Sequence, residues 1–297
     1  MTAEVRRVAL RWHGGKFVLA PWIISHFGEH RTYVEAFGGA FSVGLRKPRS
    51  YSEVYNDLDD ELVNLFRVLR DEQLGPRLLE LLRLTPFART EFLDAYEPSS
   101  CPLELARRMV VRSFMGFGSD GASGEYRTGF RASSNRSGTT AAHDWADYSD
   151  ALPALIARVR GLTIEHDDAL AVMRRHDRPT TLHYVDPPYM KATRTRANRR
   201  ADSGGVYRHE LTDEQHVALL ETLLELEGMI VLSGYPSGLY DDALKGWRRV
   251  TRFAMADGAR QRLEVLWLNP AAAKACPQPC LFDASTLESP TETELAA

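Results

Sequence analysis

The stretch LHYVDPPYM, residues 182–190, is the starting point for interpreting the fold. An apolar run typical of a buried strand stops at two prolines, which fix φ, remove hydrogen-bond donors and restrict the residue before them. Asp186 precedes the prolines and Tyr189 follows them. A carboxylate, a proline carbonyl and a flat ring at a strand end would suit an exocyclic amino group on an aromatic base. A strand that simply ends in a solvated turn fits this short stretch equally well.

Apolar runs alternate with helix-like segments on both sides of this stretch. The expected strands lie at residues 32–37, 52–56, 162–166, 181–185, 229–235 and 264–269. Leucines at helical spacing predict helices at 61–72 and 211–226. Strands that alternate with helices predict an α/β fold with a parallel sheet, and ligands bind at the carboxyl edge of such sheets. The turn at Asp186 would lie at this edge.

Residues 73–160 have a different character. LGPRLLELLRL and LELARRMVVRSFMGF both read as helices, and no strand alternation is evident. Residues 118–140 are rich in Gly, Ser and Thr, as loops are. We therefore expect an inserted, mostly helical segment here.

A glycine turn and an acid follow the first two expected strands. Gly38 and Gly39 end the first, and glycines before a helix let a ligand approach the backbone closely. Asp57 ends the second, 18 residues after Gly39, near the spacing of the acid that holds ribose hydroxyls in dinucleotide-binding folds. This predicts a nucleoside-binding carboxylate, and capping of a helix at 58–70 is the alternative.

A second glycine pair lies near the start of the chain. In RWHGGK, Gly14 and Gly15 precede Lys16. A cation beside two glycines would suit the capture of a small carboxylate or phosphate. An ordinary surface turn explains the same residues.

Composition excludes several classes of protein. The 297 residues are 44% hydrophobic and 26% charged, with a net charge of −3, so any surface that binds nucleic acid must be local. Three cysteines fit a reducing cytoplasm rather than a disulfide framework, and no Cys/His spacing predicts a metal site. His209 and His216 flank an expected helix start and are interpreted as surface or capping residues. No secretory signal or bilayer-spanning run is evident, so we expect a cytoplasmic protein without metal or membrane contact.

Several motifs in order resemble the Dam-type, or D12-class, N6-adenine DNA methyltransferases, which use S-adenosylmethionine. RWHGGK is similar to the family's KWxGGK, with Arg11 in place of Lys, and EAFGGAFSVG resembles ExFxGxGS. YNDLDDELVNLFRVLR resembles NDxNxELVNxYxxLR, and VDPPY matches the catalytic motif. The stretches YRHELTDEQHVALLETL, IVLSGYPSGLY and EVLWLNP also resemble family sequences. The resemblance covers most of the chain.

The resemblance implies a fold and a domain order. The fold would be a Rossmann-like, S-adenosylmethionine-dependent methyltransferase sheet with an inserted, mostly helical target-recognition domain. Residues 1–72 would form the cofactor-binding part of the catalytic domain, 73–160 the recognition domain and 161–282 the catalytic part. Residues 283–297 carry four acids and no base and are expected to be a disordered tail.

The resemblance also implies which residues bind S-adenosylmethionine. Trp12 and Lys16 would contact its methionine end, and Phe37 and Gly39 would line its pocket. Asp57 would bind the ribose hydroxyls. An acid near the adenine ring would be Asp168, although this assignment could fall on the neighbouring Asp167.

The catalytic motif would receive a flipped adenine through Asp186, Pro187, Pro188 and Tyr189. One position departs from the family, because Phe41 stands where the second glycine of FxGxG is expected. Its side chain would either crowd the cofactor or rotate into the core.

Basic residues near the motif are candidates for DNA binding. Residues 191–200 follow it directly and include Lys191, Arg194 and Arg196 without an acid, so they could neutralise phosphates. A solvated charged loop is the alternative. In the insert, Arg127 and Arg131 could read guanine edges, although eleven basic and ten acidic residues across 73–160 do not make a basic domain.

The leading hypothesis is a monomeric enzyme that methylates adenine N6 in double-stranded DNA, with a role in restriction-modification, in a bacterial nucleoid or encoded by a phage. RNA adenine or cytosine N4 are alternative targets, although cytosine enzymes more often carry Ser where Asp186 stands. A catalytically weakened DNA-binding module is a third hypothesis, supported by Phe41 alone. A nicotinamide-dependent Rossmann enzyme would not explain DPPY.

Overall fold

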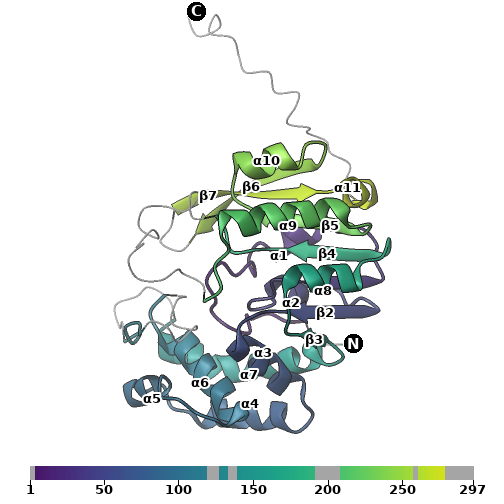
Figure 1. Ribbon diagram of the computed structural model, residues 1–297. Helices are drawn as coiled ribbons and strands as arrows, with labels where there is room; N and C mark the ends of the chain where they lie inside the picture. The colour runs from purple at the N-terminus through teal and green to yellow at the C-terminus, as the bar shows by residue number, and fades with distance from the viewer. Residues whose placement is uncertain (1–3, 119–126, 133–138, 191–207, 257–259, 278–297) are drawn as a thin grey trace, which may run out of the picture.

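The computed structural model describes residues 4–118, 127–132, 139–190, 208–256 and 260–277. Within these ranges, one seven-stranded sheet has the order β3-β2-β1-β4-β5-β7-β6 (Figure 1). The strands are β1 (Thr32–Glu35), β2 (Ser52–Asn56), β3 (Thr163–Glu165), β4 (Thr181–Val185), β5 (Met229–Gly234), β6 (Arg248–Ala256) and β7 (Arg260–Leu268). Neighbouring strands from β3 to β5 are parallel, and β7 is antiparallel to both β5 and β6. The predicted α/β fold with a mostly parallel sheet is confirmed.

The strand order reverses between β1 and β4. From β1 the chain proceeds outward through β2 to β3, and from β4 it proceeds to β5 in the other direction. Ligands of open α/β sheets bind in the crevice outside the carboxyl ends of the strands at such a switch point. The glycine turn after β1, Asp57 after β2 and the Asp186 turn after β4 all lie at this edge.

Each face of the sheet has its own hydrophobic cluster, because successive strand residues point to opposite faces. Val34, Val54 and Val185 pack with residues of the helices on one face. These helices are α8 (Ala169–His176), α9 (Asp213–Glu225) and α10 (Gly238–Ala243), which lie in front of or above the sheet in Figure 1. Tyr33 and Tyr55 point to the other face. That face packs with α1 (Ala20–Ile24), α2 (Ser42–Arg46), α3 (Asp60–Arg70) and α11 (Pro270–Ala275).

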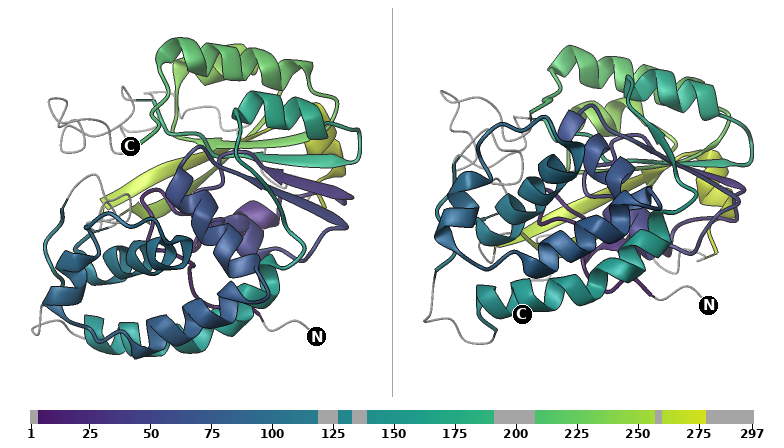
Figure 2. Two further views of the ribbon diagram at one scale, coloured as in Figure 1. Left: turned by 60° about the horizontal axis from the view of Figure 1, so that its bottom comes forward. Right: turned by 90° about the horizontal axis from the view of Figure 1, so that it is seen from below.

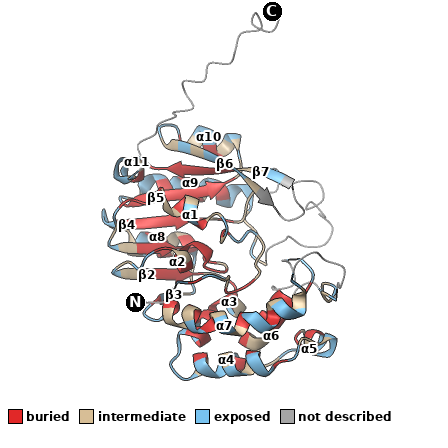
Figure 3. Ribbon diagram, turned by 180° about the vertical axis from the view of Figure 1, so that it is seen from behind, coloured by how far each residue is buried: buried red, intermediate tan, exposed pale blue. Residues whose placement is uncertain are grey.

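The described part of residues 73–160 is helical, as predicted. It contains α4 (Leu74–Leu84), α5 (Arg89–Asp94), α6 (Pro102–Met115) and α7 (Ala141–Val159), grouped below the sheet in the left view of Figure 2. Residues of α4, α6 and α7 belong to the same hydrophobic cluster as α3 and the sheet. Figure 3 shows buried residues on the strands and along parts of these helices. The helical group therefore shares a core with the sheet.

A buried ionic cluster joins α7 to the sheet. Arg158 of α7 donates to both carboxylate oxygens of Glu53 on β2, at 2.6 and 2.9 Å. Lys47 donates to the same carboxylate at 2.8 Å. Burial alone would raise the pKa of Glu53, but the bonds and charges of Arg158 and Lys47 outweigh burial and lower it. One buried carboxylate thus faces two buried cations inside the core.

No helix in the described part of the chain is both long enough and apolar enough to cross a membrane.

Candidate active site

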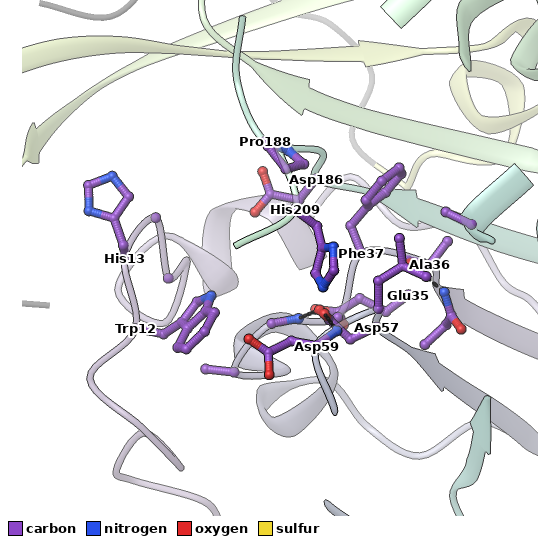
Figure 4. Close-up of a pocket in the computed structure, with 18 of the residues that line it drawn as sticks. Trp12, His13, Glu35, Ala36, Phe37, Asp57, Asp59, Asp186, Pro188 and His209 are labelled. Carbon is purple, nitrogen blue, oxygen red and sulfur yellow. Dashed lines mark hydrogen bonds between the residues drawn. The ribbon is translucent and has the colours of Figure 1, made fainter. Parts of the chain in front are cut away.

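A cavity of about 330 Å³ opens at the carboxyl ends of β1, β2 and β4 (Figure 4). Its walls come from the segment before α1, the turns after these strands and the residues leading into α9. The sequence-predicted site residues that line it are Trp12, Lys16, Phe37, Gly39, Asp57, Asp186 and Pro188. In Figure 4, Asp186 and Pro188 lie across the cavity from Asp57 and Asp59. Segments distant in sequence thus meet at the predicted edge.

Gly39 lies against Trp12 and Asp57, which belong to two other predicted cofactor motifs. Its φ is +48°, and a Cβ there would lie 3.1 Å from the indole nitrogen of Trp12, so a side chain would be both strained and crowded. The backbone N–H of Gly39 donates to Asp57 Oδ2 at 2.8 Å. Asp57 Oδ1 accepts from the N–H of Asp59 at 2.9 Å. The carboxylate of Asp57 is therefore held at the cavity wall by two backbone donors.

Asp59, and not Asp57, caps the following helix. Its side chain accepts from the backbone N–H groups of Glu61 and Leu62 at the start of α3. The interpretation of Asp57 as the helix cap is therefore wrong.

Burial raises the pKa of Asp57 to about 6, although the N–H groups of Asp59 and Gly39 favour the charged form.

Phe41 rotates into the core, which was one of the two expected outcomes. Its φ is +54°, an unusual conformation for a residue with a side chain, and the side chain is fully buried. The ring lies over Gly44, where a Cβ would come within 2.2 Å of it, and packs edge-on against Tyr55 and Phe66. The neighbours Ala40 and Ser42 line the cavity instead. Phe41 is therefore not among the described residues that line the cavity.

Asp186 faces the cavity and not bulk solvent. Its Oδ1 accepts a hydrogen bond from Ser233 Oγ at 2.7 Å, and its Oδ2 lies 3.1 Å from Lys16 Nζ. The side chain is 17% exposed, against 7% for Lys16. Lys16 also donates to the carbonyl of Gly14 at 2.8 Å and lies 4.7 Å from the ring centroid of Tyr189. A carboxylate, a cation and an aromatic ring thus meet at the end of β4.

The side chain of Tyr189 is held by residues of β7 and of the turn after β5. Its hydroxyl donates to Glu264 of β7 at 3.1 Å, and burial raises the pKa of that glutamate. The Tyr235 ring packs edge-to-face against Tyr189 with centroids 4.4 Å apart. Arg262 in turn donates to the Tyr235 hydroxyl at 2.8 Å. Pro187 and Tyr189 lie next to the cavity and are not among the described residues that line it.

The sequence model of the D12 class N6 adenine-specific DNA methyltransferases matches residues 12–233, which is most of the chain. The chain belongs to this family. It is therefore an S-adenosylmethionine-dependent enzyme that methylates adenine N6 in DNA, and the resemblance noted in the sequence is confirmed. A comparison with curated proteins gave no match.

Some residues at the methyltransferase site were not predicted. Glu35 lines the cavity, is 3% exposed and accepts through Oε2 from the Tyr33 hydroxyl at 2.6 Å and the N–H of Gly44 at 3.0 Å. Burial raises the pKa of Glu35 to about 8. Arg208 and His209 also line the cavity; both lie in the family-like stretch YRHELTDEQHVALLETL, but neither was predicted to belong to the site. The sequence did offer a signal for Glu35, because this residue is the first of the EAFGG motif.

The position of His216 differs from the one predicted from the sequence. It is fully buried, and its Nδ1 lies 2.8 Å from the Tyr240 hydroxyl, so its interpretation as a surface or capping residue was wrong. His216 shares the inner face of α9 with Leu219, Leu220 and Leu223, which are also buried. This spacing of three, four and seven residues was a readable signal for burial.

Asp168 lies at the rim of the site. Its carboxylate caps α8 by accepting from the N–H of Ala171 at 3.0 Å, and the next residue, Ala169, lines the cavity. Asp167 accepts from Arg175 at 2.6 Å. Neither acid is among the described residues that line the cavity.

The predicted DNA-binding residues have different surroundings. Lys191, Arg194 and Arg196 lie outside the described residues. Arg127 is exposed, 3.3 Å from Glu97 and over the ring of Tyr96. Arg131 is mostly covered, because it donates to the Phe114 carbonyl and lies 3.8 Å from Asp144. Among the described residues, no group of three or more His, Cys, Asp or Glu side chains is placed to hold a metal ion.

Proposed function

We propose that the methyltransferase binds S-adenosylmethionine in the cavity and transfers its methyl group to N6 of an adenine flipped out of double-stranded DNA. The catalytic residues would be Asp186, Pro187, Pro188 and Tyr189. The observation that carries this proposal is the placement of Asp186, which lines the cavity with Oδ1 held by Ser233 and Oδ2 beside Lys16, another cavity residue. The side chains that carry the proposed chemistry come from one chain, so a monomer would suffice.

The cavity residues fit S-adenosylmethionine. Asp57 would accept hydrogen bonds from ribose hydroxyls, and Gly39 leaves room that a Cβ would fill beside Trp12. Lys16 would attract the carboxylate of the methionine end, and Phe37 would line the pocket. Asp168 would lie near the adenine end. Once bound, the cofactor would supply an electrophilic methyl group.

The target base would be recognised at the turn after β4. An adenine inside a duplex must first be extruded, which costs a few kcal/mol. Asp186 Oδ2 and the carbonyl of Pro187 would each accept one N–H of the amino group, while Tyr189 offers its ring for stacking. Lys16 occupies Oδ2 in the structure, so the amino group would replace this ion pair.

Catalysis would follow from position and charge. Adenine N6 is a weak nucleophile because its lone pair is delocalised into the ring. Two acceptors on its hydrogens would favour a more pyramidal nitrogen, and the charge of Asp186 would stabilise positive charge that develops on N6. Positioning would supply much of the acceleration, with no covalent intermediate on the enzyme.

DNA contacts would come from two regions. Residues 73–160 would act as the inserted target-recognition domain between the cofactor-binding and catalytic parts. Arg127 is exposed and accessible to a base edge, whereas Arg131 would first have to leave Asp144. Lys191, Arg194 and Arg196 would neutralise phosphates next to the catalytic turn.

The test is the replacement Asp186→Ala with labelled S-adenosylmethionine. We expect methyl transfer to be lost and cofactor affinity, measured by calorimetry, to stay within about threefold, because Asp186 acts on the base. Asp242→Ala is the control, since this exposed acid lies on α10 and pairs only with Lys245 among the ion pairs of the described residues. Equal loss of transfer and cofactor binding would contradict the assigned role. Mass spectrometry of nucleosides from DNA and RNA substrates would show whether N6-methyladenine in DNA is the product.

A further inference from the structure

Ser233 lies beside Asp186 on the neighbouring strand. Val185 of β4 is paired with Leu232 of β5 in a parallel register, so Asp186 and Ser233 are the next residues along the two chains. Ser233 is 2% exposed, and its hydroxyl donates to Asp186 Oδ1 at 2.7 Å. The catalytic turn is therefore tied to β5 by a buried hydrogen bond.

Tyr184 extends this contact into the core. It lies two residues before Asp186, so both side chains point to the same face. Its side chain is fully buried, and its hydroxyl lies 3.1 Å from Ser233 Oγ. A serine hydroxyl has one hydrogen, which Ser233 gives to Asp186. Tyr184 must therefore donate to Ser233, and the hydrogen bonds run from Tyr184 through Ser233 to Asp186.

This chain of hydrogen bonds fixes one oxygen of Asp186, while the other lies beside Lys16, which also lines the cavity. Oδ2 lies 3.1 Å from the ammonium group of Lys16. The χ2 torsion of an aspartate is soft, so a carboxylate without the Ser233 bond would rotate, and neither oxygen would keep a fixed position beside Lys16. With Oδ1 held, Oδ2 keeps one position for an incoming amino group.

We propose that Ser233, supported by Tyr184, is a positioning residue that orients the Asp186 carboxylate toward the target amino group. This inference rests on the proposed function of Asp186. Ser233 acts through Asp186 and not on the cofactor, so loss of its hydroxyl lowers the rate of transfer and spares cofactor affinity. A catalytic group misplaced by about 1 Å can lose on the order of a hundredfold in rate.

The test compares Ser233→Ala, Ser233→Thr and Tyr184→Phe in single-turnover transfer from labelled S-adenosylmethionine to plasmid DNA from a host without adenine methylation. We expect Ser233→Ala to lower the rate about 10- to 100-fold and Tyr184→Phe to lower it less, with cofactor affinity unchanged. Ser233→Thr keeps the hydroxyl and should recover part of the rate. Thr222→Ala is the matched control, because it also removes a buried hydroxyl, bonded within α9 and to Arg174, and should keep the wild-type rate.

The double replacement Ser233→Ala and Tyr184→Phe should be no slower than Ser233→Ala alone, because the chain of hydrogen bonds is already broken. A wild-type rate in Ser233→Ala would overturn the positioning role, while loss of transfer in Asp186→Ala in the same assay would still uphold the proposed function. An active Asp186→Ala variant would overturn both. If Ser233→Ala does not fold, a wild-type rate in Tyr184→Phe overturns the inference, and a reduced rate with unchanged cofactor affinity supports it.

Discussion

At the scale of single residues, two acids at the cavity have surroundings that disfavour their charged forms. Burial raises the pKa of Asp57 to about 6 and that of Glu35 to about 8. Asp57 receives two backbone N–H groups, one on each oxygen, whereas Glu35 receives both of its donors on Oε2. Near neutral pH, Asp57 is therefore mostly ionised and Glu35 mostly protonated.

Cofactor affinity should depend on the ionisation of Asp57. Ribose hydroxyls donate best to a carboxylate, so below pH 6 the dissociation constant for S-adenosylmethionine should rise about tenfold per pH unit. Calorimetry between about pH 5 and 7 measures this, in a window below the pKa of Glu35. Asp57→Asn should bind more weakly at neutral pH and lose the slope. A flat profile in the wild-type enzyme would exclude Asp57 as the ribose ligand.

Glu35 should make stability depend on pH in a defined direction. The folded protein keeps the Glu35 proton up to about pH 8, while the unfolded chain releases it near the ordinary value of 4.5. The unfolded state therefore binds fewer protons in this window, so this contribution to stability is full below 4.5 and is lost as pH rises toward 8. Glu35→Gln stays neutral and keeps an acceptor for Tyr33. Urea unfolding of both proteins across the window should show a steeper decline in the wild type, and parallel profiles would contradict the buried proton.

At the scale of elements, the sequence predicted the strands that are buried and missed one that is not. β4 and β5 are buried along their whole length, and their apolar runs marked them clearly. β6 lies at the edge of the sheet and carries exposed Arg249, Arg252 and Phe253, so it has no apolar alternation to read. α7 has Pro153 in its interior, which weakens a helical pattern. Periodicity marks a one-sided pattern of burial, which β6 lacks, whereas α7 does have a buried face that its proline and polar residues conceal in the sequence.

The ionic cluster between α7 and β2 should contribute strongly to stability. Glu53→Gln would leave Arg158 and Lys47 buried without a countercharge, which typically costs about 3–5 kcal/mol of unfolding free energy. Urea unfolding measures this loss. Glu72→Gln is the control, because its pair with Arg160 is exposed at 79% and 60% and should change stability little. A Glu53→Gln variant as stable as the wild type would show that the cluster is replaceable.

At the scale of the whole molecule, part of the site followed from topology and part did not. Motifs after β1, β2 and β4 had to meet, because parallel strands place their carboxyl ends at one edge. Ser233, Glu264 and His209 lie in stretches that resemble the family, but their contacts with the site depend on strand pairing and loop packing. The conformation of Phe41 depends on the space over Gly44, which only the folded core defines. Contacts between distant segments therefore had to come from the structure.

The shared core predicts that the sheet and the helical group unfold together. α4, α6 and α7 pack into the same hydrophobic cluster as α3 and one face of the sheet, so the helical group has no core separate from that of the sheet. Hydrogen exchange measured by mass spectrometry should give peptides of α6 and β5 the same opening free energy. S-adenosylmethionine at a hundred times its dissociation constant should raise both by about 2.7 kcal/mol, because it binds only the folded state. Protection that rises in β5 and not in α6 would show instead that residues 73–160 unfold as an independent recognition domain.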